Sequence, residues 1–237
     1  MADNRSGPFI YTLSGTVQDL NIHLDGVNET YGSYYWGAVA GSCSGSITNC
    51  HVTGTVNLLY KSYVDADYSS VGGIAGYLSG TTATIENCTV GTQDSRFRMI
   101  GPNITANYIG GLAGSGNYTS NPIRYTEDTF ENYVEIDVFS VSFCGGLMGG
   151  VFYDIISDDT TIVDVQDGAS CLVDSVIDID TVHLYPSPRV PGAVGGAIGF
   201  FYFNSGGNDS LTLQHLTVTC QIQVGDNDDS YPPTRVY

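Results

Sequence analysis

Short runs in which apolar residues alternate with polar ones recur along this chain, and each run surrounds an Asn, an Asp or, once, a His. An apolar residue at every second position predicts a strand that buries one face. Asn and Asp favour a corner between two such strands, because they tolerate the left-handed backbone conformation and bond to their own backbone. Each run therefore predicts two short strands joined at a corner. The runs lie at 16–24, 46–56, 83–90, 129–138, 171–179 and 212–218.

Aligning the six runs gives three columns of equivalent residues. Strands that repeat the same apolar columns are expected to stack in parallel, with each coil about 4.8 Å from the next. No segment shows a sustained 3.6-residue period, so few helices are expected. The sequence thus predicts an all-β fold, a right-handed parallel β-helix (β-solenoid) of about five to six irregular coils with projecting loops. The columns are Val17, Ile47, Ile85, Phe130, Leu172, Leu213; then Asp19, Asn49, Asn87, Asn132, Asp174, His215; then Ile22, Val52, Val90, Val134, Ile177, Val218.

A glycine-rich phrase of five residues also recurs, with the pattern Gly-Gly/Ala-apolar-x-Gly. Its regular spacing, in step with the apolar columns, distinguishes it from a flexible linker. We expect glycine at these positions because the wall of the solenoid passes close to its neighbour or turns sharply there. The first and last glycines of the five copies are Gly37 and Gly41, Gly72 and Gly76, Gly110 and Gly114, Gly145 and Gly149, and Gly195 and Gly199.

Together the two phrases, GGxAG followed by IxNCxVxG, resemble the GLUG repeat of bacterial surface proteins, adhesins and some secreted peptidases. The similarity is clearest at 37–56 and 72–90, weaker at 110–138 and degenerate at 145–222. This resemblance implies a β-solenoid surface module. It implies no catalytic residue, because the repeat carries none.

The repeats divide the chain into three parts. Residues 1–14 are expected to form an N-terminal extension or cap, 15–224 the GLUG-like solenoid, and 225–237 an extended acidic tail that contains Pro232 and Pro233. Two alternatives are open for the tail, because the last coil of a solenoid leaves a strand edge exposed. The tail either reaches a neighbouring chain or folds back and caps its own coil.

The net charge and the N-glycosylation sequons indicate which partners and which location to expect. With 25 acidic and 7 basic residues, the formal charge of −18 argues against nucleic acid or an anionic membrane as a partner. No run approaches the ~20 apolar residues of a membrane span, and the N-terminus lacks the pattern of a signal peptide. Sequons nevertheless favour an extracellular or cell-surface glycoprotein, although the one at Asn87 is disfavoured by its strand pattern. The glycosylation candidates are Asn4, Asn28, Asn103, Asn117 and Asn208.

Three of the six cysteines are candidates for disulfide bonds. Cys50 and Cys88 occupy one column in successive coils, so their Cα atoms are expected about 5 Å apart, within disulfide reach. Side chains stacked in register also point the same way, which suits a ladder of free thiols instead. Cys43 and Cys50 span a turn and form a second candidate pair. No CxxC motif indicates a zinc site.

Clustered aspartates make calcium the one candidate cofactor. Hard cations favour several carboxylates, but neither cluster fits a known calcium loop, and a solvated acidic face is the plainer alternative. The candidate ligands are Asp158 and Asp159 in one cluster and Asp226, Asp228 and Asp229 in the other.

The sequence predicts no enzyme and no catalytic residue. None of the four histidines belongs to an HxxxH or HExxH motif, and no GxSxG motif occurs. We expect a structural or adhesive module in a surface or filamentous assembly, with other protein chains, copies of itself and glycans as partners. The rival class is a polysaccharide hydrolase or lyase on a β-helix, since a hydrolase needs only two carboxylates. Two roles are open for the seventeen tyrosines: they form a contact surface for a partner, or they pack the wall of the solenoid.

Overall fold

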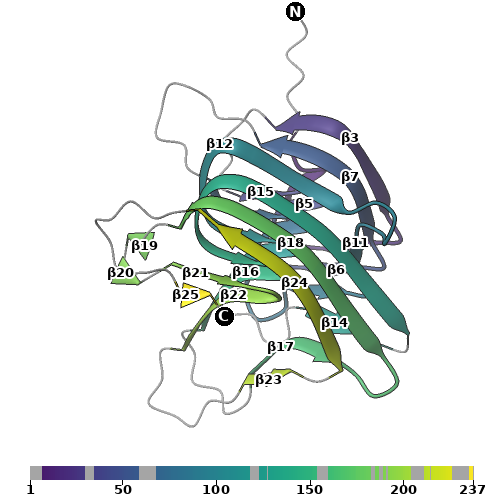
Figure 1. The fold of residues 1–237 in the computed structure, drawn as a ribbon. Helices are drawn as coiled ribbons and strands as arrows, with labels where there is room; N and C mark the ends of the chain where they lie inside the picture. The colour runs from purple at the N-terminus through teal and green to yellow at the C-terminus, as the bar shows by residue number, and fades with distance from the viewer. Residues whose placement is uncertain are drawn as a thin grey trace, which may run out of the picture.

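The fold consists of strands stacked side by side (Figure 1). The computed structural model describes residues 7–29, 35–58, 68–117, 123–126, 128–153, 160–182, 185–186, 189–190, 192–203, 211–213, 215–225 and 235–236. Within these ranges the chain forms no helix, and hence none long and apolar enough to cross a membrane. Three sheets run through the stack, and their strands pair in parallel.

Two of the sheets have six strands each, taken from the chain in regular alternation. In sheet A the strands are β1 (Ile10–Leu13), β5 (Ala40–Cys43), β9 (Ala75–Ser79), β13 (Ala113–Asn117), β16 (Met148–Tyr153) and β22 (Ile198–Phe203). In sheet B they are β2 (Thr16–Gln18), β6 (Ser46–Thr48), β10 (Thr84–Glu86), β14 (Ile123–Tyr125), β17 (Thr160–Val165) and β23 (Leu211–Leu213).

Sheet C contains the longest strands and five short strands, three of which end at the first residue of a glycine phrase. Its long strands follow one another across the stack in Figure 1: β3 (Asn21–Glu29), β7 (His51–Leu58), β12 (Phe97–Gly110), β15 (Thr129–Gly145), β18 (Ser170–Val182) and β24 (Leu216–Val224). Its short strands are β4 (Tyr35–Gly37), β8 (Tyr68–Gly72), β11 (Thr89–Val90), β21 (Ala193–Gly195) and β25 (Arg235–Val236). A separate antiparallel pair joins β19 (Tyr185–Pro186) to β20 (Arg189–Val190).

Along the sequence, the chain visits sheets A, B and C in turn and then returns to sheet A. We call one such passage a layer, so that layer 1 contains β1 to β4 and layer 6 contains β22 to β25. Each strand of sheet A or B pairs with its equivalent in the next layer. The fold is therefore all-β with parallel sheets, as the sequence predicted, and this topology is compatible with a parallel β-helix.

The apolar column in sheet B was predicted correctly in four of the six layers. The assignments of Phe130 and Leu172 to this column were wrong, because both residues lie in sheet C near the starts of β15 and β18. Their places are taken by Ile123 and Val163, whose strands lie on shorter alternating segments that precede the long ones. In register the column reads Val17, Ile47, Ile85, Ile123, Val163 and Leu213.

The predicted corners are also correct in layers 1, 2, 3 and 6. Asp19, Asn49, Asn87 and His215 are the non-glycine residues of the described chain that have a positive φ, between 52° and 56°. The corners predicted at Asn132 and Asp174 were wrong, because both residues lie inside long strands. The third column shifts for the same reason: Ile22, Val52 and Val90 are in register, whereas Val134 pairs with Ser175, Ile177 with Ile222 and Val218 with Val173.

Close approach of the backbone explains the glycine phrase, as expected. A Cβ on the second glycine of a phrase would meet the carbonyl oxygen of the next layer, at 2.2 Å for Gly73 against Gly111 and 2.0 Å for Gly111 against Gly146. A Cβ on the last glycine would collide with the strand that leads into the glycine phrase of the previous layer, as for Gly76, where it would lie 2.5 Å from the amide nitrogen of Trp36. The phrase is thus a tight bend between sheets C and A.

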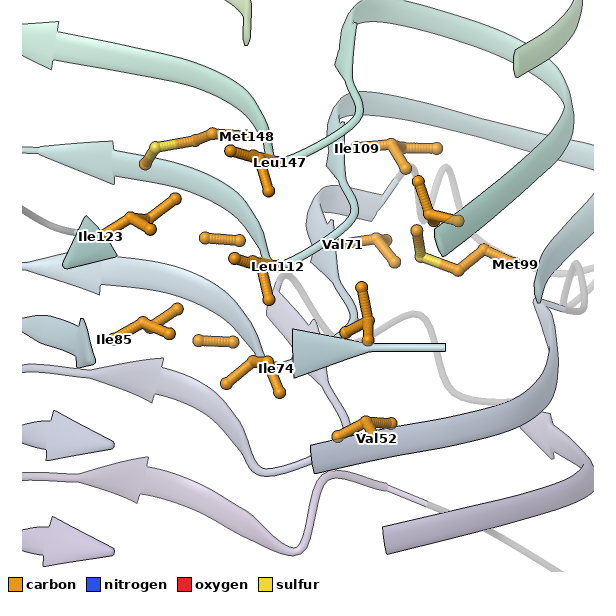
Figure 2. Close-up of a cluster of buried hydrophobic side chains, with 14 of the residues drawn as sticks. Val52, Val71, Ile74, Ile85, Met99, Ile109, Leu112, Ile123, Leu147 and Met148 are labelled. Carbon is orange, nitrogen blue, oxygen red and sulfur yellow. The ribbon is translucent and has the colours of Figure 1, made fainter. Parts of the chain in front are cut away.

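One hydrophobic core runs along the inside of the stack. Figure 2 shows how each apolar residue rests on its equivalent in the next layer, as Ile74 on Leu112 and Leu112 on Leu147. A smaller cluster forms on the outer side of the glycine bend, where Phe143 stacks on Tyr108 at 5.3 Å and on Phe200 at 4.2 Å between ring centroids. Part of the aromatic content therefore packs the wall.

Both ends of the chain join the sheets. Strand β1 pairs with β5, so layer 1 begins within the segment that the sequence analysis set apart as an extension. At the other end, β25 pairs in parallel with β21, with Ala193 facing Arg235. Within the described residues, the end of the tail thus pairs with its own chain, and both alternatives for the tail stay predictions.

Candidate functional site

An interruption in sheet C creates a candidate site. Strand β11 pairs with the start of β7 and stops after two residues, at Val90. The chain then makes a loop over residues 91–96 and re-enters the sheet at Phe97, which faces Val134 of β15. Strand β15 runs without interruption through the same region, so a gap remains between β11 and the start of β15.

The side chain of Asn132 takes over the missing backbone pairing at this gap. Asn132 is fully buried, and its Oδ1 accepts a hydrogen bond from the amide of Val90 at 3.1 Å. Its Nδ2 donates to the hydroxyl of Tyr125 at 3.0 Å, and that hydroxyl donates to the carbonyl of Cys88 at 3.1 Å. Burial raises the pKa of Tyr125 well above its ordinary value. The gap is therefore held by a neutral, satisfied network.

Arg96 fixes the loop that borders the gap. Gly91 opens the loop with a φ of 68°, and Thr92 and Ser95 exchange backbone hydrogen bonds of 2.8 and 3.1 Å. The guanidinium of Arg96 lies 5.9 Å from the centre of the Tyr133 ring and bonds the carbonyl and the carboxylate of Asp174, both at 2.8 Å. Because Tyr133 and Asp174 lie in successive layers, one arginine of layer 3 is tied to layers 4 and 5.

The gap forms an open groove with a volume of 420 Å³. Its lining combines aromatic rings with hydroxyl, amide, imidazole and carboxylate groups. Among the described lining residues, Glu131 is the one carboxylate. The lining consists of His51, Thr89, Gly91, Thr92, Gln93, Thr129, Phe130, Glu131 and Tyr133.

Hydrogen bonds orient the polar groups of the groove. The Nδ1 of His51 shares a hydrogen bond with the hydroxyl of Thr89, and burial lowers the pKa of the half-buried imidazole. The hydroxyl of Tyr133 donates to the carboxylate of Glu131 at 3.1 Å. Burial and this carboxylate together raise the pKa of Tyr133, so the phenol stays protonated and continues to donate. The groove thus offers fixed donors and acceptors beside aromatic surface.

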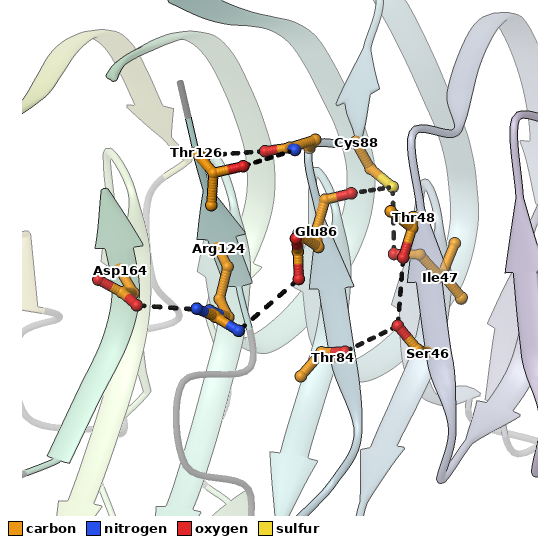
Figure 3. Close-up of polar contacts among 10 residues, drawn as sticks. Ser46, Ile47, Thr48, Thr84, Glu86, Cys88, Arg124, Thr126 and Asp164 are labelled. Carbon is orange, nitrogen blue, oxygen red and sulfur yellow. Dashed lines mark hydrogen bonds and ion pairs between the residues drawn. The ribbon is translucent and has the colours of Figure 1, made fainter. Parts of the chain in front are cut away.

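A second group of polar side chains covers the outer face of sheet B, as Figure 3 shows. Arg124 lies between the carboxylates of Glu86 and Asp164, at 3.7 and 3.4 Å. Nearby, the corner residue Asn87 exchanges two hydrogen bonds of 2.9 Å with Thr126 of the next layer. These groups satisfy one another along the stack, so we assign them a structural role.

The glycosylation candidates are separated in the structure. Asn103 is exposed on β12, and Asn117 is half-buried at the end of β13. The backbone of Asn28 lies in β3, while its side chain, Asn4 and Asn208 lie outside the described residues. The disfavoured sequon at Asn87 is at a corner, where its amide is bonded to Thr126. Of the two candidates whose side chains the structure describes, Asn103 is therefore the better presented to solvent.

The disulfide candidates Cys43, Cys50 and Cys88 are buried free thiols in the structure. The Sγ of Cys88 accepts a hydrogen bond from the amide of Cys50 at 3.2 Å, which confirms that the two residues are neighbours in one column. The thiol of Cys88 lowers the pKa of Cys50 to about 7, whereas burial raises the pKa of Cys88. The stacked pair of thiols is the arrangement that the structure has.

The calcium candidates Asp158, Asp159, Asp226, Asp228 and Asp229 all lie outside the described residues. Within the described ranges, no three His, Cys, Asp or Glu side chains gather in a way that could hold a metal ion. The calcium site therefore stays a prediction.

Sequence reasoning missed the groove and the two residues that form it. Asn132 was taken for a corner because its column holds Asn, Asp or His elsewhere, and Arg96 belongs to no repeated column. A signal was present in the spacing: the run at 83–90 stops at Val90, seven residues before the next apolar residue, Phe97, that joins the sheet.

Comparison with known proteins identifies one motif in the chain. Residues 67–91 match the family model of the GLUG motif, which confirms the resemblance seen in the sequence. The match spans β8, the bend at Gly72, β9, β10 and the corner at Asn87, and it ends at the edge of the groove. No curated protein and no solved structure matches the chain.

Proposed function

We propose that this chain is a non-enzymatic extracellular module with a structural or adhesive role in a surface or filamentous assembly, built as a right-handed parallel β-helix. The handedness is supported by the connections, which leave a strand, pass through the two other sheets and return to a parallel neighbour. Connections of this kind are right-handed in about 98% of cases.

A structural role is supported by the way the arginines are used. Each of the three arginines whose side chains the structure describes pairs with a carboxylate of another layer. Such pairs hold successive layers together and fix their register, although each exposed pair contributes only about 0.2–1 kcal/mol. The pairs are Arg96 with Asp174, Arg98 with Glu135, and Arg124 with both Glu86 and Asp164.

The adhesive role is carried by the lining of the groove, and we propose a glycan as its ligand. Aromatic rings, hydroxyl groups and a positioned carboxylate are suited to a neutral sugar chain, which offers both apolar faces and hydroxyl groups. A glycoside hydrolase would need two carboxyl groups about 5–9.5 Å apart, whereas the described lining contains Glu131 alone. This observation favours binding over hydrolysis.

The test is to screen the full chain against immobilised neutral and acidic polysaccharides and to compare two matched variants. Glu131→Gln removes the charge in the groove and should reduce binding of a retained glycan at least about fivefold. Glu135→Gln makes the same change four residues further along β15, outside the groove, and should bind like the wild type. Equal binding by all three proteins would refute the groove as the site.

The same polysaccharides, incubated with the protein in solution, test the rival class of enzyme. We expect neither new reducing ends nor unsaturated products. Turnover that disappears in Glu131→Gln would assign the groove to a carbohydrate-active enzyme instead.

The extracellular location has a separate test. Mass spectrometry of native material should find N-glycans, first of all at the exposed Asn103. Unmodified peptides at Asn103 and Asn117 in native material would count against a glycosylated surface protein.

A further inference from the structure

The two ends of the stack are complementary in shape, and we propose that a second copy of this chain docks head to tail, with its layer 1 on layer 6 of the first. This inference rests on the proposed structural role and specifies the partner and the contact. The stack would then continue from one copy into the next, with strand pairing of the kind seen inside each copy.

The end strands of sheet B and the long end strands of sheet C match in length and in order. Sheet C ends in β3 at one side and β24 at the other, each nine residues long, and sheet B ends in β2 and β23, each three residues long. In the described part of the chain, no strand pairs with the outer edge of β3 or of β24. Such edges present a row of backbone donors and acceptors to another chain.

The spacing of residues through the corner is also the same at both ends. Val17 and Leu213 occupy one column, and the corner follows two residues later, at Asp19 and at His215. Docked in the register that the layers use, Ile22 of one copy therefore falls on Val218 of the other. No residue has to be inserted or skipped over this stretch.

Apolar columns lie open at both ends. Phe9 precedes Ile10, which pairs with Ala40, so Phe9 starts the column of Val39 and is 69% exposed. At the opposite end Val218 is 41% exposed, although it faces the buried Val173. Docking buries Phe9 over the small Ala197, which ends the same column. It also removes the exposed side chains of Phe9 and Val218 from water.

The corners supply complementary hydrogen-bonding groups. Inside the chain, the carboxylate of Asp19 accepts a hydrogen bond from Asn49 of the next layer at 3.3 Å. The equivalent position on layer 6 is His215, an exposed residue with the same left-handed backbone. In the docked pair the imidazole of His215 meets the free side of Asp19 of the second copy, so that a hydrogen-bond donor faces a carboxylate at the junction.

Head-to-tail contacts of this kind are heterologous and do not close, so they produce filaments instead of dimers. The charge of −18 on each copy opposes association, and salt screens this repulsion as the Debye length falls from about 30 Å at 0.01 M to about 8 Å at 0.15 M. Filaments are therefore expected at physiological ionic strength and above, in preference to low salt.

The experiment measures mass by sedimentation and by electron microscopy over a range of protein and salt concentrations. Val218→Lys places a charge on the inner, apolar side of the edge strand and should shift the onset of association to at least tenfold higher concentration. Thr219→Lys adds the same charge to the next residue, on the outer side of β24, and should associate like the wild type. Both substitutions are at exposed positions of layer 6, and circular dichroism checks that both variants fold.

A charge exchange tests the register. His215→Asp should weaken association by placing two carboxylates together, and adding Asp19→His to the same chain should restore it. A wild-type chain that stays monomeric at high concentration, or a Val218→Lys variant that assembles unchanged, would overturn the proposal. Neither result would affect glycan binding by the groove, which lies in layers 2 to 4, so the proposed function is tested independently.

Discussion

The Oδ1 atom of Asn132 accepts a hydrogen bond of 3.1 Å from the amide of Val90, across a place where the backbones of β11 and β15 do not pair. The side-chain oxygen of Asn132 thus accepts a hydrogen bond that a backbone carbonyl would otherwise accept. Because Asn132 accepts this hydrogen bond, β11 can end and the chain can leave the sheet while the buried amide of Val90 keeps an acceptor. The groove lies beside this contact, and Arg96 holds the loop that borders it.

Replacing Asn132 should destabilise the protein. Asn132→Leu leaves the amide of Val90 buried without a partner, and we expect a loss of about 1–3 kcal/mol in the free energy of unfolding. Urea denaturation measures it. Asn103→Leu, at an exposed position of the neighbouring strand β12, is the matched control and should change stability by less than about 0.5 kcal/mol. Equal effects at the two positions would contradict the role of Asn132.

The glycine bends should reject even a methyl group. Gly73→Ala places a Cβ 2.2 Å from the carbonyl oxygen of Gly111, so the layers must shift apart, and we expect a loss of at least about 1–3 kcal/mol. Gly15→Ala is the matched change, because nothing lies within 4 Å of a Cβ there, and its effect should stay below about 0.5 kcal/mol. Thermal unfolding of the two variants measures the difference in stability. Similar melting temperatures would refute the predicted clash at Gly73.

His51 should make the protein more sensitive to acid. Burial lowers its pKa below the ordinary value of 6.5, so between the folded pKa and 6.5 the unfolded chain binds more protons than the folded one. Its contribution to stability is therefore complete above pH 6.5 and is lost as the pH falls through the folded pKa. His51→Gln should lose less stability than the wild type between pH 7 and pH 5.

Urea denaturation at the two pH values measures this difference. His23→Gln provides the matched histidine variant, because His23 also bonds a threonine, Thr53, at 2.9 Å but is exposed. It should lose as much stability as the wild type. A loss in His51→Gln equal to that of the wild type would contradict the assignment to His51.

Arg96 should control the order of the loop at 91–96. Arg96→Met keeps most of the aliphatic stem but removes both bonds to Asp174 and the contact with the Tyr133 ring. Hydrogen exchange at the amides of 92–95 should then become at least tenfold faster. Arg98→Met, which removes the exposed pair with Glu135, should leave those amides unchanged. Unaltered exchange in Arg96→Met would show that the loop is held by other contacts.

The sequence by itself determined that the fold is all-β with parallel sheets, the position of each glycine bend and four of the six corners. These features depend on local chemistry: alternating apolar residues make half-buried strands, Asn and Asp accept a left-handed backbone, and only glycine allows backbones to approach so closely. The same local signals are sufficient for the GLUG motif at 67–91 to be recognised.

Only the tertiary structure decided layers 4 and 5 and the groove. The local alternation of apolar residues would allow either Ile123 or Phe130 in the apolar column of sheet B. Ile123 occupies it because Ile123 pairs with Ile85 and Val163 in the neighbouring layers. Asn132 looks like a corner in sequence, yet it is buried in a long strand because Val90 and Tyr125 satisfy its amide. Register and satisfaction of buried polar groups are properties of neighbouring layers, and no single segment of the sequence contains them.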